Sequence, residues 1–264
     1  MAGSDTAGVR VERSDAVATV TIATPRGALD SGAKQALRTS LEALGEDPAV
    51  RAVILTGSGP VFCVGQDLKA HAAALAADAT AAWDTVRDHY NPIVTALATM
   101  PKPVIAAVNG VAAGAGASFA FACDLRLVAD TAAFHLAFSG IGLSADSGLS
   151  WTLPRLVGFG RAVDLLLRAR PIPSSSAMEL GLAHEVVAAD ALAERAASVA
   201  AELASGPTVA FGAMKQALAY SAGHGLVDAL DMEAAMQTVA GTTEDHAAAV
   251  QAFLEKRTPT FNGR

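Results

Sequence analysis

The 264-residue sequence is poor in cysteine, in aromatic side chains and in charge. Its two cysteines, Cys63 and Cys123, each lie inside an apolar run. That placement is typical of reduced core thiols in a cytosolic protein and not of a disulfide framework. Histidines and cysteines are scattered singly, without the spacing of a metal-ligand set. We therefore expect a cytoplasmic protein that binds no metal.

Basic side chains are also too few to form a nucleic-acid surface. The chain has 19 Lys and Arg against 26 Asp and Glu, for a formal net charge of −7, and no basic cluster. It lacks the roughly 18 continuous apolar residues of a membrane helix. The N-terminal MAGSDTAG has neither the basic nor the apolar region of a signal peptide. Neither nucleic acid nor membrane is expected as a partner.

Apolar residues, by contrast, are abundant. They make up 52% of the chain, whereas only 17% of residues are charged. This balance is unusual for a soluble monomer and predicts apolar surface buried between subunits. The length suits one large α/β domain with an appendage, or two small domains.

Short apolar strands alternate with helical segments through most of the chain. Strands are expected at 9–12, 16–23, 52–56, 103–108, 125–129 and 185–187, and helices at 32–44, at 70–100 with breaks near 78–80 and 91–92, at 153–167, and from 174 or 175 to 181. The alternation favours a largely parallel sheet with right-handed crossovers. From about Asp190 onward only helices are indicated. The sequence thus predicts an α/β core at 1–204 and a helical region at 205–264.

Strand, glycine turn and helix start occur together twice. The first instance is 61–69, VFCVGQDLK, and the second runs from the buried strand at 103–108 through Gly114-Ala115-Gly116 to the apolar segment 118–122. Because glycine and alanine have little or no side chain, a ligand can approach the backbone N–H groups at these turns. N–H groups near a helix start can hold an anion or a developing oxyanion.

Five segments then follow one another in a characteristic order: GPVFCVGQDLK, PKPVIAAVNGVAAGAGASFAFACDLRLVA, GLSADSGLSWTLPRLVG, ARPIPSSSAMELGLAHEVV and AFLEKRTPTF. Together they resemble the crotonase (enoyl-CoA hydratase/isomerase) superfamily over nearly the whole chain, and most of all its epoxyphenylacetyl-CoA isomerase-like members. The resemblance implies a spiral of ββα units with a C-terminal helical trimerisation region. It also implies a homotrimer or dimer of trimers, and a coenzyme A thioester as substrate with no further cofactor.

The resemblance assigns an oxyanion hole to two backbone N–H groups. These are the amides of Gln66, after Gly65, and of Ala115, after Gly114. Such donors stabilise the negative charge that develops on a thioester oxygen as an α-proton leaves, and losing one costs about 2.7–4 kcal/mol.

The same resemblance implies a set of substrate-binding residues. Arg26 and Lys69 would approach the CoA nucleotide, and Phe253 with Lys256 would contribute from the tail. The set also includes Cys63, Gly65, Gly114, Phe138 and Trp151. The alternative interpretation from the residues alone is that Arg26, Lys69 and Lys256 are solvated charges and that Phe253 is a core side chain.

The sequence departs from the hydratase pattern at both acid/base positions. Hydratases of the family use two glutamates to add water across a conjugated double bond. Those positions align with Ser118 and Phe138. A phenylalanine cannot hold or deprotonate water, so hydration is disfavoured.

Asp146, in SADSG, resembles the single acid/base of the family's isomerases. One carboxylate suffices to move a proton from the carbon α to the thioester to the γ carbon. The apolar neighbours expected to keep the site dry and to raise its pKa are Phe134, Phe138, Ile141, Leu143 and Trp151. The alternative interpretation is that Asp146 caps a helix that begins near Ser147.

Other readings remain open. A hydratase or other lyase could use a different base, and a non-catalytic acyl-CoA-binding protein of this fold would need none. Gly116-Ala117-Ser118-Phe119-Ala120 resembles a nucleophile elbow without its last glycine. His135 and His184 are candidate bases. Tyr90 is a candidate for the wall of the acyl pocket.

Overall fold

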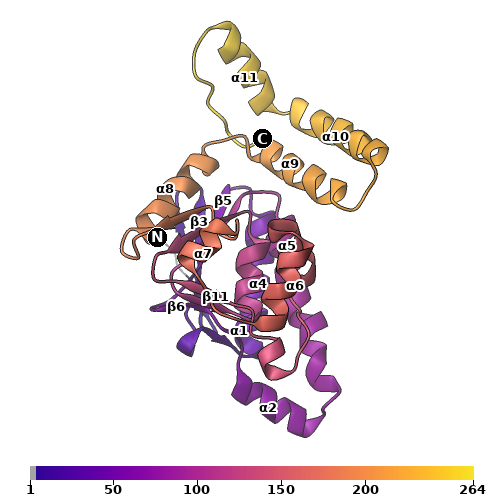
Figure 1. Ribbon diagram of the computed structural model, residues 1–264. Coiled ribbons are helices and arrows are strands. Elements are labelled where there is room, and N and C mark those ends of the chain that lie inside the picture. The colour runs from indigo at the N-terminus through magenta and orange to yellow at the C-terminus, as the bar shows by residue number, and fades with distance from the viewer. Residues whose placement is uncertain (1–3) are drawn as a thin grey trace.

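A seven-stranded sheet forms the centre of the protein in the computed structural model, which describes residues 4–264 (Figure 1). In spatial order its strands are β1 (Ser4–Thr6), β2 (Val9–Ser14), β3 (Val17–Ile22), β5 (Ala52–Gly57), β8 (Val104–Val108), β10 (Leu125–Ala129) and β13 (Glu185–Val187). The first three are antiparallel, and all later pairings in this sheet are parallel. The strands predicted at 9–12 and 16–23 form an antiparallel hairpin, and the predicted parallel strands are confirmed.

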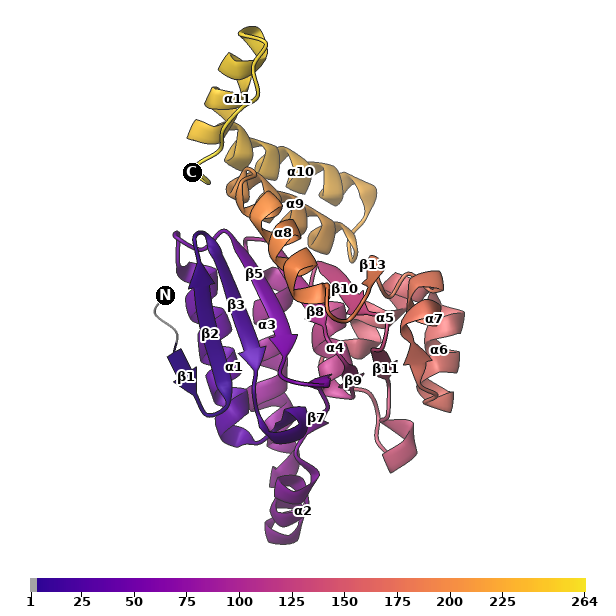
Figure 2. The same ribbon diagram turned by 90° about the vertical axis from the view of Figure 1, so that its left-hand side faces the viewer.

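Helices cover both faces of this sheet. In Figure 2, α1 (Ser31–Glu46) and α3 (Asn91–Thr99) lie behind it and α8 (Leu192–Ala204) lies in front. Because both faces are covered, every residue of β8 is buried. The Asp30 carboxylate caps α1 by accepting the Ala33 N–H at 2.8 Å, and the apolar face of α1 then packs inward, as predicted.

A smaller, four-stranded sheet has the same order of successive strands as the large sheet. The four-stranded sheet runs β12 (Ile172–Pro173), β11 (Ala133–His135), β9 (Val111–Ala113) and β6 (Val61–Cys63), and a small pair joins β4 (Ala28–Leu29) to β7 (Gly65–Gln66). Strands β5, β8 and β10 pair in parallel in the large sheet, and β6, β9 and β11 do so in the small one. Successive strand–strand–helix units therefore stack as a spiral, which is the predicted architecture.

Two helical predictions need correction. The segment expected to be one helix at 153–167 is split into α5 (Leu149–Val157) and α6 (Phe159–Arg168), because Gly158 has φ 81° and ends the first. No break occurs at 91–92. After α2 (Leu68–Ala77) and a 3₁₀ turn (Ala81–Trp83), a π-helical turn (Val86–Tyr90) runs directly into α3. Pro92 lies in the first turn of α3, where a missing N–H costs nothing.

The last three helices extend beyond one end of the sheet (Figure 1). They are α9 (Thr208–Ser221), α10 (Leu226–Gly241) and α11 (Glu244–Leu254), and they follow α7 (Ser174–Glu179), β13 and α8 in the chain. Their exposed apolar side chains include Met214, Leu218, Leu226, Val227 and Leu230. The division at residue 204 and the trimer remain predictions. Within residues 4–264 no helix combines the length and the apolar character that crossing a membrane requires.

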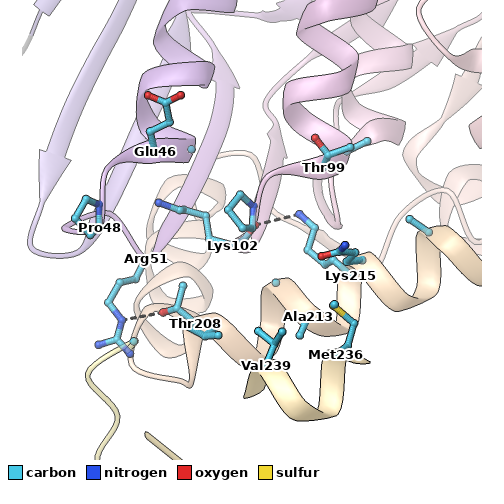
Figure 3. A pocket seen from close by; sticks show the side chains of 18 of the residues that line it. Glu46, Pro48, Arg51, Thr99, Lys102, Thr208, Ala213, Lys215, Met236 and Val239 are labelled. Atoms are coloured by element: carbon cyan, nitrogen blue, oxygen red, sulfur yellow. Dashed lines mark hydrogen bonds between the residues drawn. The ribbon is translucent and has the colours of Figure 1, made fainter. Parts of the chain in front are cut away.

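A cavity of about 660 Å³ lies where the core meets α9 and α10 (Figure 3). Its cationic groups are engaged in structural contacts. The Lys102 Nζ donates to the backbone oxygens of Leu44 and Asp47 at 2.9 and 2.8 Å, and the Lys215 Nζ donates to the Lys102 carbonyl and to Asp124. The Lys102 contacts hold the start of β8 to the end of α1, and the Lys215 contacts join this part of the core to α9.

Arg51 holds the C-terminal region to the core. Its guanidinium donates to the Gly206 carbonyl at 2.5 Å, and to the Thr208 hydroxyl and the Phe261 carbonyl at 3.0 Å each. Replacing Arg51 with alanine is expected to accelerate hydrogen exchange at 206–212 and 261–264. A local loss of about 1–2 kcal/mol corresponds to a factor of roughly 5–30.

Arg10→Ala is the matched control, because it removes only an exposed ion pair with Glu12. Mass spectrometry would follow the exchange, with the buried amides of β8 as the internal reference. Equal acceleration across the whole chain, or none at the two named segments, would show that Arg51 does not have this role.

Candidate active site

A second cavity, of about 670 Å³, collects most of the predicted site residues. Its walls come from the turn after β3, from β7 and the start of α2, from the π-helical turn, from the start of α4 (Ala115–Ala122) and from the loop before α5. The predicted site residues that line it are Arg26, Gln66, Lys69, Gly114, Ala115, Phe138 and Asp146. Segments 120 residues apart in sequence therefore converge on one chamber.

The two amides predicted for the oxyanion hole lie on adjacent turns. Gly65 has φ 77°, and a Cβ placed on it would lie 3.1 Å from the Ala115 nitrogen. A Cβ on Gly116 would lie 2.0 Å from the Cys63 carbonyl oxygen. The two turns are thus packed backbone against backbone, which only glycine permits at these positions.

The backbone around these amides is held in place. Gly65 donates to the Cys63 sulfur at 3.4 Å, and Asp67 donates to the Leu29 carbonyl at 3.0 Å, so the peptide before Gly65 and the peptide after Gln66 are both held. Ala115 is the first residue of α4, and an N–H at that position has no intrahelical partner. Both amides can therefore serve an anionic oxygen in the cavity.

Asp146 lies on the loop between β11 and α5. The Ser147 hydroxyl donates to its Oδ1 at 2.8 Å. Burial raises the pKa of the Asp146 carboxyl above its usual range, and the Ser147 hydrogen bond opposes this rise. Ser147 itself has φ 52°, a costly conformation for a residue with a Cβ.

The capping interpretation of Asp146 is wrong. The N-cap of α5 is Gly148, and no side chain caps that helix. Asp146 contributes only its main-chain carbonyl, which accepts the Leu149 N–H at 3.0 Å. Its carboxylate plays no part in capping, and Asp146 lines the cavity.

The apolar wall beside Asp146 is smaller than predicted. Phe138, Ile141 and Leu143 line the cavity. Phe134 is fully buried in the core against Phe121, with ring centroids 4.9 Å apart. Trp151 is 45% exposed on α5, with the Arg155 guanidinium 4.2 Å from the centre of its ring. The turn at Ser147 and Gly148 begins α5 in an orientation that leaves Trp151 outside the cavity lining.

Four more predicted binding residues lie outside the cavity lining: Cys63, Gly65, Phe253 and Lys256. Cys63 is fully buried beneath it, and desolvation raises the pKa of its thiol to about 12. Phe253, on α11, is 82% exposed, and Lys256 follows that helix. Figure 2 shows α11 and α2 at opposite ends of the molecule, so the tail does not reach the cavity of its own chain.

The mouth of the cavity carries charged and aromatic groups. Arg26 lies in the turn before β4, and Lys69 is exposed on the first turn of α2. His71 and Trp83 meet edge to face at 4.9 Å. Asp67 is the other carboxylate of the lining, and its Oδ1 caps α2 by accepting the Ala70 N–H at 2.8 Å.

The remaining candidate bases and nucleophiles have structural partners. The Ser118 side chain is buried and donates to the Gly114 carbonyl at 3.3 Å. His135 Nε2 lies 2.8 Å from the Ala169 carbonyl oxygen, and His184 Nδ1 accepts the Arg126 N–H at 3.1 Å. None of the three lines the cavity. Over the described residues, no three His, Cys, Asp or Glu side chains form a group that could hold a metal ion.

A polar network behind Gln66 was missed by the sequence reasoning. The Gln66 Oε1 accepts from Lys34 Nζ at 3.0 Å and from the Tyr90 hydroxyl at 2.7 Å, and Lys34 also donates to Thr85 at 2.6 Å. Tyr90 lines the cavity, as proposed for it. The available signal was the position of Lys34 on the buried face of α1, one residue after Ala33.

Comparison with known proteins identifies the class to which this fold and cavity belong. The family model described as enoyl-CoA hydratase/isomerase matches residues 12–264, so the chain belongs to this family. The predicted crotonase-like fold is confirmed, and the chain is an acyl-CoA-processing enzyme of the hydratase/isomerase superfamily.

Individual relatives differ in the reaction for which they are named. A probable enoyl-CoA hydratase of Rhodobacter capsulatus is 41% identical, covering 97% of this chain and 98% of its own. The 1,2-epoxyphenylacetyl-CoA isomerase of Escherichia coli is also 41% identical, covering 86% and 87%. The crystal structure of a putative enoyl-CoA hydratase/isomerase from Mycobacterium abscessus has a TM-score of 0.92 at 45% identity, covering 97% and 100%. The reaction must therefore be argued from the site.

Proposed function

We propose that the protein is an enoyl-CoA isomerase that moves a carbon–carbon double bond by a 1,3-proton shift, with Asp146 as its single acid/base. The observation that carries this proposal is that the acidic groups of a hydratase are missing from their usual positions, while a different carboxylate lines the cavity. The two positions that hold glutamates in hydratases are here a serine turned toward the Gly114 carbonyl and an apolar wall residue, Phe138. Asp146 instead supplies a carboxylate in apolar surroundings.

The reaction balances with this one carboxylate. Ionised Asp146 removes a proton from the α carbon of a 3-enoyl thioester, and the C–H electron pair forms a dienolate with negative charge on the thioester oxygen. The protonated Asp146 then returns the proton to the γ carbon, and the double bond becomes conjugated with the carbonyl. No water and no redox partner is consumed, so the dry wall at Phe138, Ile141 and Leu143 suits this chemistry.

The backbone amides of Gln66 and Ala115 stabilise the intermediate. Both belong to the same lining as Asp146, so a thioester carbonyl held between them places its α carbon toward the acid. Because these donors are fixed before the substrate arrives, they need no reorganisation when charge develops.

Substrate binding is proposed to follow the same arrangement. Arg26 and Lys69, at the mouth, would meet the phosphates of coenzyme A, which would act as part of the substrate and without another cofactor. In a homotrimer or dimer of trimers, Phe253 and Lys256 of one subunit would contact the cavity of another. Their distance from their own cavity supports this arrangement.

One observation favours a second candidate, an enoyl-CoA hydratase. Asp67 also lines the cavity, and two carboxylates are what the addition of water requires. The Asp67 Oδ1 is already engaged as the cap of α2, where it accepts the Ala70 N–H. The name of the Rhodobacter capsulatus relative is in line with this alternative.

The isomerase proposal can be tested by offering two substrates and following the same absorption band with each. The purified protein is mixed with a 3-enoyl-CoA and, separately, with a 2-enoyl-CoA, and the band of the conjugated thioester is followed. An isomerase generates the band from the first and removes little of it from the second. A hydratase removes it from the second. Binding of both thioesters without turnover would instead identify a non-catalytic acyl-CoA-binding protein.

A further inference from the structure

Lys34 is a buried cation at a position where a helix normally carries an apolar side chain. It is only 2% exposed, on the face of α1 that packs against the core. Within residues 4–264 its ammonium group forms no ion pair. The nearest compensating charge is Asp30, at the start of the same helix, and burial still lowers the pKa of Lys34.

The partners of Lys34 are neutral, and they lead to the cavity. Its Nζ donates to the Gln66 Oε1 at 3.0 Å and to the Thr85 hydroxyl at 2.6 Å. The Tyr90 hydroxyl donates to the same Gln66 oxygen at 2.7 Å. The side chain of Gln66 is thus clamped from two sides, whereas its backbone N–H is the amide proposed for the oxyanion hole.

A buried ammonium with neutral partners does little for stability. An apolar side chain of similar length at this position of α1 would avoid the cost of removing the charge from water, and such replacements are often neutral or stabilising. Features of this kind, which break the pattern of a core helix without a gain in stability, occur mainly at functional sites.

We propose that Lys34 is a positioning residue of the oxyanion hole, which holds Gln66 in place and adds positive charge behind the thioester oxygen. The proposal rests on the thioester-binding half of the proposed function and is independent of where Asp146 moves the proton. Fixing the Gln66 side chain orients the peptide that carries its N–H. The ammonium charge then favours the enolate over the neutral thioester, because the surrounding medium screens it poorly.

The test compares two buried lysines. Lys34→Met removes the clamp, and Lys102→Met removes an ammonium that is 4% exposed and bonded only to backbone carbonyls, far from this cavity. The direct readout is the absorption band of cinnamoyl-CoA, which moves to longer wavelength when hydrogen bonds polarise its thioester carbonyl. The second readout is kcat against KM for the 3-enoyl-CoA.

Lys34→Met is expected to reduce the red shift and to lower kcat by roughly 10- to 100-fold, with KM changed less than about threefold and the melting temperature unchanged or raised. Gln66→Met should reproduce these losses, and the double variant should be no worse than the more affected single variant. Lys102→Met should keep the full red shift. Additive losses in the double variant, or a full red shift in Lys34→Met, would overturn the proposal.

The outcome is separable from that of the isomerase assignment. If the wild type shifts the cinnamoyl-CoA band but does not convert the 3-enoyl-CoA, the assigned reaction is wrong and the band still tests Lys34. If the wild type produces no shift, the amides do not polarise the carbonyl and the role of Lys34 fails with them.

Discussion

Replacing Asp146 with asparagine is expected to lower kcat for 3-enoyl-CoA isomerisation by roughly 100- to 10,000-fold, the usual contribution of a positioned acid/base. The amide keeps the size of the side chain and can still accept the hydrogen bond from Ser147, but it can neither remove nor return the proton. Thioester binding and the red shift of cinnamoyl-CoA should persist, because they depend on Gln66 and Ala115. Stopped-flow absorbance measures the rate of isomerisation and the red shift of bound cinnamoyl-CoA.

Asp67→Asn is the matched control within the same cavity. Asparagine caps a helix about as well as aspartate, so α2 should remain intact while the second carboxylate is removed. A much smaller loss is expected than for Asp146→Asn. Isomerisation at the wild-type rate in Asp146→Asn would refute the assigned base, and loss of hydration in Asp67→Asn would favour a hydratase.

The pH dependence of the wild type provides a check without mutation. The base must be ionised, so kcat/KM falls as the pH drops through the pKa of Asp146. Because burial raises that pKa, the midpoint of the acid limb should lie above the ordinary aspartate value of 3.8. A midpoint at or below that value would place the essential acid elsewhere.

Replacing Gly114 with alanine is expected to be the second most damaging change. Gly114 has φ 52° and ψ −124°, a region essentially restricted to glycine, although a Cβ there would meet no atom within 4 Å. The cost is therefore backbone strain, which can be relieved only by turning the peptide that carries the Ala115 N–H. We expect a fall in kcat of roughly 100- to 1,000-fold, as for the loss of one oxyanion donor, and a stability loss of about 1–3 kcal/mol.

Gly140→Ala distinguishes strain from mere addition of a methyl group. Gly140 lies in the 3₁₀ turn Ser139–Ile141 beside the cavity, its φ is not positive, and it too has open space around it. Its replacement should change the free energy of unfolding by less than about 0.5 kcal/mol. Thermal unfolding and steady-state kinetics of the two variants make the comparison. Equal behaviour of the two would show that the backbone at Gly114 is not critical.

Much of the large sheet could be predicted because its strands are long enough to show a pattern. The continuous apolar run of β8 and the alternation in β2 and β3 are direct consequences of burial on two faces or on one. The short strands β9 and β11 escaped prediction, since three residues show no period and these two runs, unlike the equally short β13, lack a pair of β-branched residues. Strand β9 leads directly to Gly114, and β11 leads to the loop that carries Phe138, so both strands position parts of the cavity wall.

The candidate site was predictable where backbone chemistry decides it and unpredictable where orientation does. Glycines at 65, 114 and 116 mark the turns, because neighbouring backbone leaves no room for a Cβ at 65 and 116, and the backbone dihedrals at 114 favour glycine. The positions of Trp151 outside the cavity lining and of Phe134 in the core could not be predicted, because both depend on how the chain enters α5 and β11. Lys34 was missed because a lysine within a helical pattern is normally solvated.

The single carboxylate at Asp146 also constrains the stereochemistry of the proposed reaction. The Asp146 side chain is held by the Ser147 hydroxyl, and in the proposed reaction the two amides would hold the thioester. The acid therefore faces only one side of the planar dienolate. A proton taken from the α carbon must then return to the γ carbon on that same side, so the isomerisation is suprafacial and would transfer part of an α-deuterium label directly into the product.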